Sequence, residues 1–114
     1  MENENRRTPR FECTGNASVQ MTPLGPHCAA QVLDLSAAGC RIVFEKPHRL
    51  SIGMKVDLTF NVNQIPFRVW GLVKAIRSDK TIGLEFPPMR ERMSRRLEDL
   101  IEELKDHPPA HSTA

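Results

Sequence analysis

The sequence has no tyrosine, one tryptophan and five phenylalanines among its 114 residues. Proteins that bind single-stranded nucleic acid need exposed aromatic side chains on which bases stack, together with a strongly basic groove. The formal net charge here is only +2. The composition therefore disfavours a small barrel that binds single-stranded nucleic acid, and we expect no DNA or RNA partner.

Cysteine is scarce and lacks the spacing of a structural site. The three cysteines, Cys13, Cys28 and Cys40, are odd in number and form no CxxC motif. This pattern disfavours a disulfide framework and a zinc ribbon. The four histidines are scattered without the spacing of metal ligands. We expect reduced thiols, and neither a metal nor another cofactor.

Long apolar runs and catalytic motifs are missing as well. No apolar run approaches the ~20 residues that span a bilayer. The N-terminus is charged from its second residue, which argues against a secretory signal peptide. The sequence also has no GxSxG, P-loop or GxGxxG motif, and no cysteine has an evident histidine partner. We expect a cytoplasmic protein that is not an enzyme and does not bind membranes.

Six segments of alternating or β-branched-rich residues predict strands, and short polar turns separate them. The clearest is MKVDLTF, which places its apolar residues from Met54 to Phe60 on one face. In the first segment Gly15-Asn16 disturbs the alternation and predicts a β-bulge. The pattern indicates one domain, either an antiparallel sandwich or a closed barrel. The predicted strands occupy residues 10–21, 28–35, 40–45, 54–60, 67–77 and 81–86, with NVNQIP (61–66) as a turn.

A helix is predicted only after Pro87 and Pro88, which end the sheet. Apolar residues recur at helical spacing from Met89 to Leu104 and predict an amphipathic helix from about 88 to 105. Its apolar stripe either packs as core or forms a partner surface, and the sequence leaves both open. We expect a flexible arm at 1–9, a folded domain at 10–105 and a disordered tail at 106–114.

A basic cluster, NRRTPR, occupies residues 5–10. Guanidinium groups present planar forks of donors that match phosphate oxygens, and the O6 and N7 edge of guanine, two at a time. In an extended segment Arg6, Arg7 and Arg10 can wrap a compact polyanion. A solvated basic tail is the simpler interpretation of this stretch taken alone.

A second polar motif, DLSAAG, follows at residues 34–39. The Asp34 carboxylate can accept from the N1–H and N2–H of guanine, and the Ser36 hydroxyl can donate to a phosphate or accept from a base amine. Gly39 permits positive φ and a close backbone approach to a ligand. Because Asp34 and Ser36 are two apart, they point the same way from a strand. An ordinary Asx or Ser turn ended by glycine also explains the motif taken alone.

Three further features allow two interpretations each. Arg41 can reach a phosphate, although a solvent-facing strand residue is the simpler reading. Trp70 is either a core or barrel-surface residue, or a platform on which a purine stacks. Four arginines within 90–96 crowd the start of the predicted helix, against its dipole. They form either a surface for an acidic partner or a solvated face paired with nearby carboxylates.

The two motifs together resemble the PilZ domain family, the bacterial receptors for cyclic di-GMP. The family pattern is RxxxR followed later by [DN]xSxxG, and this chain supplies RRTPR (6–10) and DLSAAG (34–39). Its last predicted strand, IGLEF (82–86), is similar to the closing strand of the family. The resemblance spans about residues 4–105 and implies a six-stranded antiparallel β-barrel with a C-terminal α-helix.

The resemblance also implies a ligand and its binding residues. The arginine segment would fold over cyclic di-GMP as a lid, while the DxSxxG turn would hold a guanine from the barrel surface. The ordered lid would then present a surface to a downstream protein that governs motility, adhesion or exopolysaccharide output. The ligand-binding residues would be Arg6, Arg7, Arg10, Asp34, Ser36 and Gly39.

Two points stay open within the resemblance. Some family members carry a basic residue directly before RxxxR, which favours an intercalated ligand dimer; here Asn5 takes that place, so one or two nucleotides bind per protomer. The alternative function is a protein-interaction adaptor that has the fold without nucleotide binding, although such members typically lack the arginine motif. We expect a monomer or a weak homodimer.

Overall fold

The computed structural model describes residues 11–22 and 24–106. Several expectations lie outside these residues. They are the N-terminal arm (1–9), residues 107–114 of the tail, and the arginines Arg6, Arg7 and Arg10.

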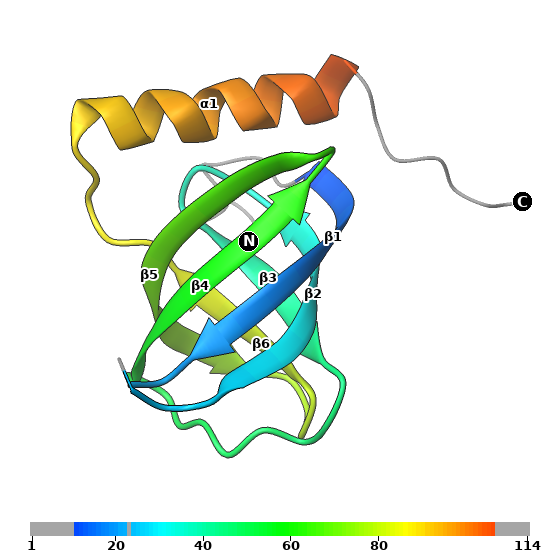
Figure 1. The fold of residues 1–114 in the computed structure, drawn as a ribbon, viewed down its shortest axis with the longest axis vertical. Coiled ribbons are helices and arrows are strands. Elements are labelled where there is room, and N and C mark those ends of the chain that lie inside the picture. Colours follow the sequence, from blue (N-terminus) through cyan, green and yellow to red (C-terminus); the bar gives the residue numbers. More distant parts are fainter. Residues whose placement is uncertain (1–10, 23, 107–114) are drawn as a thin grey trace, which may run out of the picture.

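Six antiparallel strands form a closed barrel, with one helix after the last strand (Figure 1). The prediction of a six-stranded antiparallel β-barrel with a C-terminal α-helix is confirmed. Around the barrel the strands follow the order β1-β2-β3-β6-β5-β4. Their bounds are β1 (Phe11–Gln20), β2 (His27–Leu35), β3 (Gly39–Phe44), β4 (Lys55–Val62), β5 (Ile65–Ile76) and β6 (Thr81–Glu85), and the helix is α1 (Glu91–Asp106).

The sheet closes because one connection leaves the hairpin pattern. β3 pairs with β6 rather than with β4, and residues 45–54 carry the chain across to β4 (Figure 1). β4 then pairs with both β5 and β1. The pairing of β1 with β4 joins the first strand to the last free edge, so the structure is a barrel and not a sandwich.

Two register shifts lie close to Asp34, the first predicted site residue that the structure describes. The β1–β2 register shifts between Glu12 and Gly15, so the bulge predicted for this strand is present but lies just before Gly15. The β2–β3 register shifts between Val32 and Asp34. Bulges bend a strand and re-aim the side chains beside them. Together the two shifts set the direction of Asp34 at the end of β2.

The strand-by-strand pattern holds with two corrections. Val56, Leu58 and Phe60 face the core as predicted, but Met54 precedes β4 and is 36% exposed. The predicted turn at 61–66 is shorter, because β4 continues to Val62 and β5 begins at Ile65. Asn63 and Gln64 both have positive φ, as the two central residues of a type I′ hairpin turn require.

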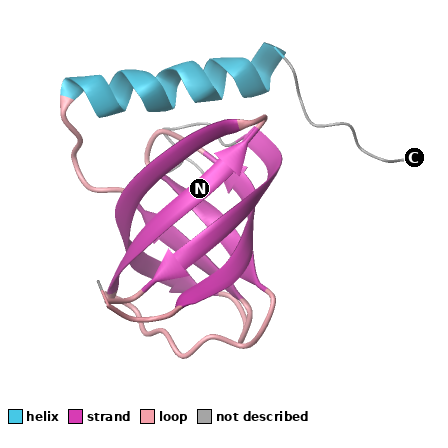
Figure 2. Cartoon of the chain, in the orientation of Figure 1, coloured by secondary structure: helices cyan, strands magenta, loops and turns pink. Residues whose placement is uncertain are grey.

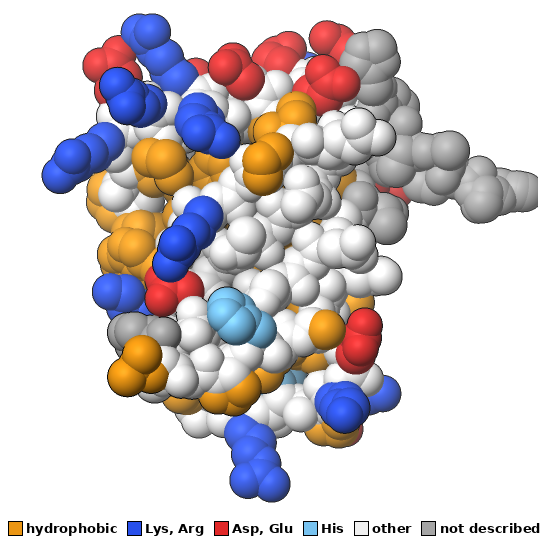
Figure 3. Space-filling view, viewed as in Figure 1, with side chains coloured by type: hydrophobic (Ala, Val, Ile, Leu, Met, Phe, Trp, Pro, Cys, Tyr) orange, Lys and Arg blue, Asp and Glu red, His pale blue; other side chains and the backbone are white. Residues whose placement is uncertain are grey.

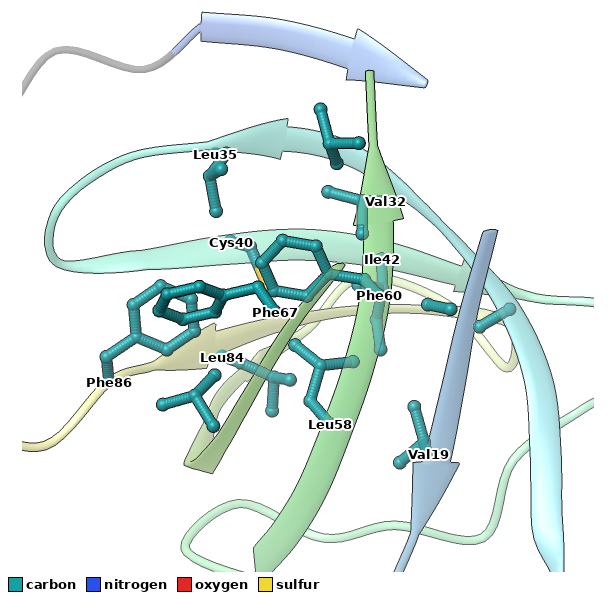
Figure 4. Packing of buried hydrophobic residues seen from close by; sticks show 14 of the residues in the cluster. Val19, Val32, Leu35, Cys40, Ile42, Leu58, Phe60, Phe67, Leu84 and Phe86 are labelled. Atoms are coloured by element: carbon teal, nitrogen blue, oxygen red, sulfur yellow. The ribbon is translucent and has the colours of Figure 1, made fainter. Parts of the chain in front are cut away.

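The barrel interior is filled with aliphatic and phenylalanine side chains (Figure 4). The rings of Phe60 and Phe67 lie 5.4 Å apart and are tilted by 35°. Leu35, at the end of β2, and Cys40, at the start of β3, belong to this core on either side of the DLSAAG turn. The turn is therefore anchored to the packed interior at both of its ends.

α1 lies across one end of the barrel, and loops close the other end (Figure 2). Leu97, Leu100 and Leu104 are buried, so the apolar stripe packs as core rather than as an exposed partner surface. The predicted helix started at about 88, whereas α1 begins at Glu91, with the first hydrogen bond from Ser94 N–H to Arg90 O. Within residues 11–22 and 24–106, no helix has the length and apolar character needed to cross a membrane.

Candidate functional site

The DLSAAG turn joins β2 to β3 and is closed by Ser36. Its backbone N–H donates to Gly39 O at 2.8 Å, and its hydroxyl oxygen accepts from Ala38 N–H at 3.1 Å and from Gly39 N–H at 3.2 Å. The hydroxyl also lies 3.3 Å from Gly39 O, to which it donates. Ser36 is buried and its polar capacity is used inside the turn. A direct contact between this hydroxyl and a guanine therefore stays a prediction.

Glycine is needed at position 39 because the backbone of β6 lies close to it. Among the described glycines only Gly53 has positive φ, so Gly39 does not use the left-handed region that the sequence suggested. A Cβ at position 39 would instead collide with the carbonyl oxygen of Leu84 in β6. The close approach that glycine permits is thus an approach of β3 to β6. Phe86 N–H also donates to Ala38 O at 2.8 Å, which ties the turn to the end of β6.

Asp34 is a buried carboxylate paired with Arg41. The two residues are cross-strand neighbours on β2 and β3, and Arg41 Nη2 lies 3.1 Å from Asp34 Oδ2. The Asp34 side chain is 7% exposed and that of Arg41 is 42% exposed. No described residue gives a hydrogen bond to Asp34 Oδ1 or accepts one from Arg41 Nε, although both atoms are buried. The simpler prediction for Arg41, a solvent-facing strand residue, is therefore incomplete.

The charge of Asp34 also affects a nearby thiol. Burial, together with a smaller effect of the nearby Asp34 carboxylate, raises the pKa of Cys13 from 9.0 to about 12. Cys13 is therefore a protonated, unreactive thiol at neutral pH. All three cysteines are free, as expected for reduced thiols.

A hollow of about 240 Å³ lies beside the turn, on the outside of the barrel. Ligand pockets for drug-sized molecules usually measure roughly 300–1,000 Å³, so this hollow can hold one base rather than a whole dinucleotide. It contains both cationic and anionic side chains next to the turn. Its lining residues are Ser36, Ala38, Gly39, Cys40, Arg41, Lys74, Ala75, Arg77, Gly83, Leu84 and Glu85.

A larger hollow, of about 460 Å³, lies at the other end of the barrel. It is bounded by the β3–β4 connection and by the ends of β1 and β2, and its lining is mainly apolar. It contains none of the predicted site residues that the structure describes. Of these two hollows the apolar one is larger, whereas the polar turn and the ion pair of Arg41 lie at the smaller one, and we take the smaller one as the candidate site.

The chain enters the barrel directly at this site. Phe11, the first described residue, pairs with Leu35, and Glu12 pairs with Asp34. Arg10 is the residue before Phe11, so the RxxxR segment joins β1 next to the DLSAAG turn. Of the six predicted ligand-binding residues, the structure thus places Asp34, Ser36 and Gly39 together; the three arginines lie outside the described residues.

The remaining candidates occupy the surface. Trp70 is 37% exposed on the outside of β5, and Lys55 Nζ lies 4.5 Å from the centre of its ring, so Trp70 is not a core residue. It lines a hollow together with Ala37 of the turn and Pro88 of the linker to α1. At the start of α1, Arg95 pairs with Glu91 at 2.8 Å, as the solvated-face interpretation expects.

The ion pair between Arg41 and Asp34 is the feature of the site that sequence reasoning missed. Leu35 pairs with Cys40 across the turn, so the next residues outward, Asp34 and Arg41, face each other. The sequence predicts a four-residue turn from Ser36 to Gly39 between two strands, and this turn length determines which residues face each other. Counting outward from the turn would have predicted the pair.

The comparison with known families agrees with these features. A sequence model of the PilZ domain matches residues 4–103, which include both motifs and nearly the whole barrel and helix. The chain belongs to the PilZ domain family. A search of curated protein sequences found no match.

Solved PilZ structures share the fold. The chain superposes on YcgR from Escherichia coli in complex with c-di-GMP with a TM-score of 0.76 at 18% identity, covering 89% of this chain and 46% of YcgR. The PilZ domain of CeSA from a cellulose-synthesizing bacterium gives 0.70 at 13% identity, covering 85% of this chain and 98% of that domain. The MrkH–c-di-GMP complex from K. pneumonia gives 0.71 at 20% identity, covering 88% and 52%.

These similarities establish the fold of the PilZ domain at low sequence identity. The chain spans about half the length of YcgR and of MrkH, since it covers 46% and 52% of those proteins. Within the residues that the structure describes, no group of three or more His, Cys, Asp or Glu side chains is arranged to hold a metal ion.

Proposed function

We propose that this PilZ domain is a receptor for cyclic di-GMP that transmits the level of this second messenger to a partner protein. One observation carries the proposal: the chain enters β1 beside the DLSAAG turn, since Phe11 pairs with Leu35. Arg10 directly precedes Phe11 in the sequence, and Glu12 pairs with Asp34, a buried carboxylate whose Oδ1 has no hydrogen-bond partner among the described residues. Structures of YcgR and MrkH with c-di-GMP support the same ligand.

The chemistry of the proposed complex divides between the two motifs. Arg6, Arg7 and Arg10 donate to the phosphates and to the O6 and N7 edge of guanine, because guanidinium forks match both. Asp34 accepts from N1–H and N2–H of a guanine that occupies the hollow of about 240 Å³. Ser36 and Gly39 shape the turn that follows Asp34 and line the same hollow. The protein binds the nucleotide and catalyses no reaction.

Signal transmission in this proposal depends on the arginine segment. Bound nucleotide holds residues 6–10 against the barrel, and a partner recognises the resulting surface. The output would be motility, adhesion or exopolysaccharide production, in the cytoplasm. The proposal includes no DNA, RNA or membrane partner and a monomer or weak homodimer, with one or two nucleotides per protomer.

Isothermal titration calorimetry with cyclic di-GMP tests the proposal, with GTP as the control ligand. Each charge-assisted hydrogen bond contributes roughly 1.5–3 kcal/mol, so we expect Arg6→Ala and Arg10→Ala each to weaken binding by about 10-fold or more. Arg68→Ala removes an exposed arginine on β5 and should leave binding unchanged. If both motif variants bind like the parent, the site assignment is wrong. If the parent releases no heat at high micromolar ligand, the adaptor function is favoured.

A further inference from the structure

The ion pair between Arg41 and Asp34 is only half made. A guanidinium and a carboxylate can form two parallel hydrogen bonds, but here a single contact joins Nη2 to Oδ2 at 3.1 Å. The second acceptor, Asp34 Oδ1, and a second donor, Arg41 Nε, have no hydrogen-bond partner among the described residues. Within the part of the chain that the structure describes, one carboxylate oxygen and one guanidinium donor of the same ion pair are therefore unused.

An ion pair with buried atoms that lack hydrogen bonds lowers the stability of the fold unless another group supplies those hydrogen bonds. Buried polar atoms without a partner lose the hydrogen bonds they make in water, and the loss is larger for charged groups. Arg41, one member of the pair, lines the hollow beside the DLSAAG turn, and its side chain is 42% exposed. A ligand that offers an adjacent acceptor and donor would satisfy both groups at once.

We propose that Arg41 is a specificity-determining residue that reads guanine together with Asp34. In this arrangement the Arg41 guanidinium donates to O6 of the base while the Asp34 carboxylate accepts from N1–H and N2–H. The inference rests on the proposed function, because it concerns the base of the same dinucleotide. It assigns to a residue outside both sequence motifs the choice between guanine and adenine.

The donor and acceptor pattern explains why adenine is rejected. Guanine presents an acceptor at position 6 beside a donor at N1, which matches a guanidinium beside a carboxylate. Adenine presents an amine donor at position 6 and an acceptor at N1. Against this pair, adenine would place donor against donor and acceptor against acceptor. Such mispairing leaves buried polar groups unsatisfied, which is an effective basis for discrimination.

The strands around Arg41 leave room for a flat base. Arg41 pairs in register with Gly83 on β6, and Gly83 pairs with Ala75 on β5. These three residues all line the hollow, so its floor carries no bulky side chain beside the guanidinium. A Cβ at position 83 would meet only the Cβ of Ala75, at 3.6 Å. A purine can therefore lie across Gly83 with its edge toward Arg41, the cross-strand neighbour of Asp34.

Titration of the parent and of Arg41→Met with cyclic di-GMP and with cyclic di-AMP tests the inference. A base-reading hydrogen-bonded pair discriminates by roughly 1–3 kcal/mol, or about 5- to 150-fold. We expect Arg41→Met to lose affinity for cyclic di-GMP by a factor in this range while its weak affinity for cyclic di-AMP does not fall. The control Arg68→Met removes the same charge elsewhere on the barrel, and both affinities should match those of the parent. Equal losses for both dinucleotides would mean that Arg41 contacts phosphate and would overturn the inference.

A second measurement separates a direct contact from an effect exerted through Asp34. In the Asp34→Asn background, Arg41→Met should still lower cyclic di-GMP affinity by roughly fivefold or more, because the contact to O6 does not require the carboxylate. No further loss in that background would show that Arg41 only holds Asp34, and would overturn the direct contact. Far-ultraviolet circular dichroism confirms that each variant is folded.

A second variant, Arg41→Lys, keeps the test valid even if Arg41→Met fails to fold. Arg41→Lys keeps a positive charge beside the buried carboxylate but lacks the planar fork. We expect it to fold and to lose part of its preference for cyclic di-GMP over cyclic di-AMP; an unchanged preference would count against the inference. If the parent itself binds no cyclic di-GMP, the proposed function fails and the role of Arg41 with it. Binding by the parent with unchanged selectivity in every Arg41 variant overturns the role of Arg41 alone.

Discussion

At the scale of single residues, Ser36 and Gly39 build the turn, and Asp34 and Arg41 form the ion pair beside it that we propose reads the ligand. Ser36 satisfies two backbone N–H groups inside the turn, and Gly39 lets β3 approach β6. Asp34 is buried and keeps one unpartnered oxygen among the described residues. The DxSxxG motif therefore combines two architectural residues with one that presents an unpaired acceptor.

Replacing Ser36 by alanine should destabilise the domain by about 1–3 kcal/mol, because two N–H groups in a partly buried turn lose the acceptor that the buried Ser36 hydroxyl provides. Ser78 provides a matched control: its hydroxyl accepts from Lys80 N–H and Thr81 N–H, both at 3.1 Å, in an exposed turn. Ser78→Ala should cost less than about 1 kcal/mol, since water replaces the lost acceptor. Urea denaturation of both variants gives the comparison. Equal losses would show that the Ser36 hydroxyl is not structural.

Gly39 and Gly83 form a second matched pair on neighbouring strands. Gly39→Ala should destabilise the domain by about 1–3 kcal/mol or more, because its Cβ collides with the Leu84 carbonyl oxygen of the adjacent backbone. Gly83→Ala should change stability by no more than about 0.5 kcal/mol, because its Cβ makes only an ordinary contact with Ala75. Thermal unfolding distinguishes the two. A stable Gly39→Ala protein would contradict the close packing of β3 on β6.

The residue types of the site were predictable from the sequence, whereas their partners were not. Asp34, Ser36 and Gly39 follow from the motif, yet their contacts depend on how β2, β3 and β6 pair. The reason for glycine at position 39 is a non-local contact with Leu84. The role expected for it, positive φ, is a local property, and local reasoning could not detect a strand more than forty residues away along the chain.

At the scale of elements, α1 is charged against its own dipole. The four arginines within 90–96 lie at its N-terminal end, and acidic residues predominate from 98 to 106. Figure 3 shows basic side chains gathered at the left end of α1, where the helix begins, and acidic ones further along it. Each such charge is unfavourable by a few tenths of a kcal/mol. Packing of the apolar face therefore holds the helix in place.

Leu100→Ala measures how much the packing of α1 contributes to the free energy of unfolding. Leu100 is fully buried, so its truncation should cost about 2–5 kcal/mol. Leu24 is 99% exposed in the β1–β2 turn, and Leu24→Ala should change stability by no more than about 0.5 kcal/mol. Urea midpoints report both values. If Leu100→Ala were as stable as the parent, α1 would not be part of the core in solution.

The strands were predicted well because every second residue of a barrel strand faces the core. This alternation of apolar and polar residues can be recognised within a short stretch of sequence. The errors fall where backbone conformation decides. The turn after β4 is shorter than predicted because Asn63 and Gln64 adopt positive φ. Met54 was assigned to β4 from its apolar character, but it lies before that strand, where its sulfur accepts a hydrogen bond from Ser51 N–H at 3.1 Å.

At the scale of the whole molecule, the barrel has two distinct ends. The start of β1, the DLSAAG turn and the beginning of α1 lie toward one end, where Ala37, Pro88 and Ser94 line a common hollow. The larger apolar hollow lies at the opposite end, against the β3–β4 connection. The PilZ match covers residues 4–103 and so includes both ends, whereas the proposed ligand concerns the first end only, and we predict ligand binding at the first end and none at the second.

The central claim is that cyclic di-GMP binds where the RxxxR segment meets the DLSAAG turn. Titration of the ¹⁵N-labelled protein with cyclic di-GMP, followed by amide chemical shifts, tests this claim most directly. We predict saturable shifts at Asp34, Ala38, Gly39 and Gly83, with His27 and Leu50 at the other end unchanged. Shifts that cluster around the β3–β4 connection, or no saturable shifts at all, would contradict it.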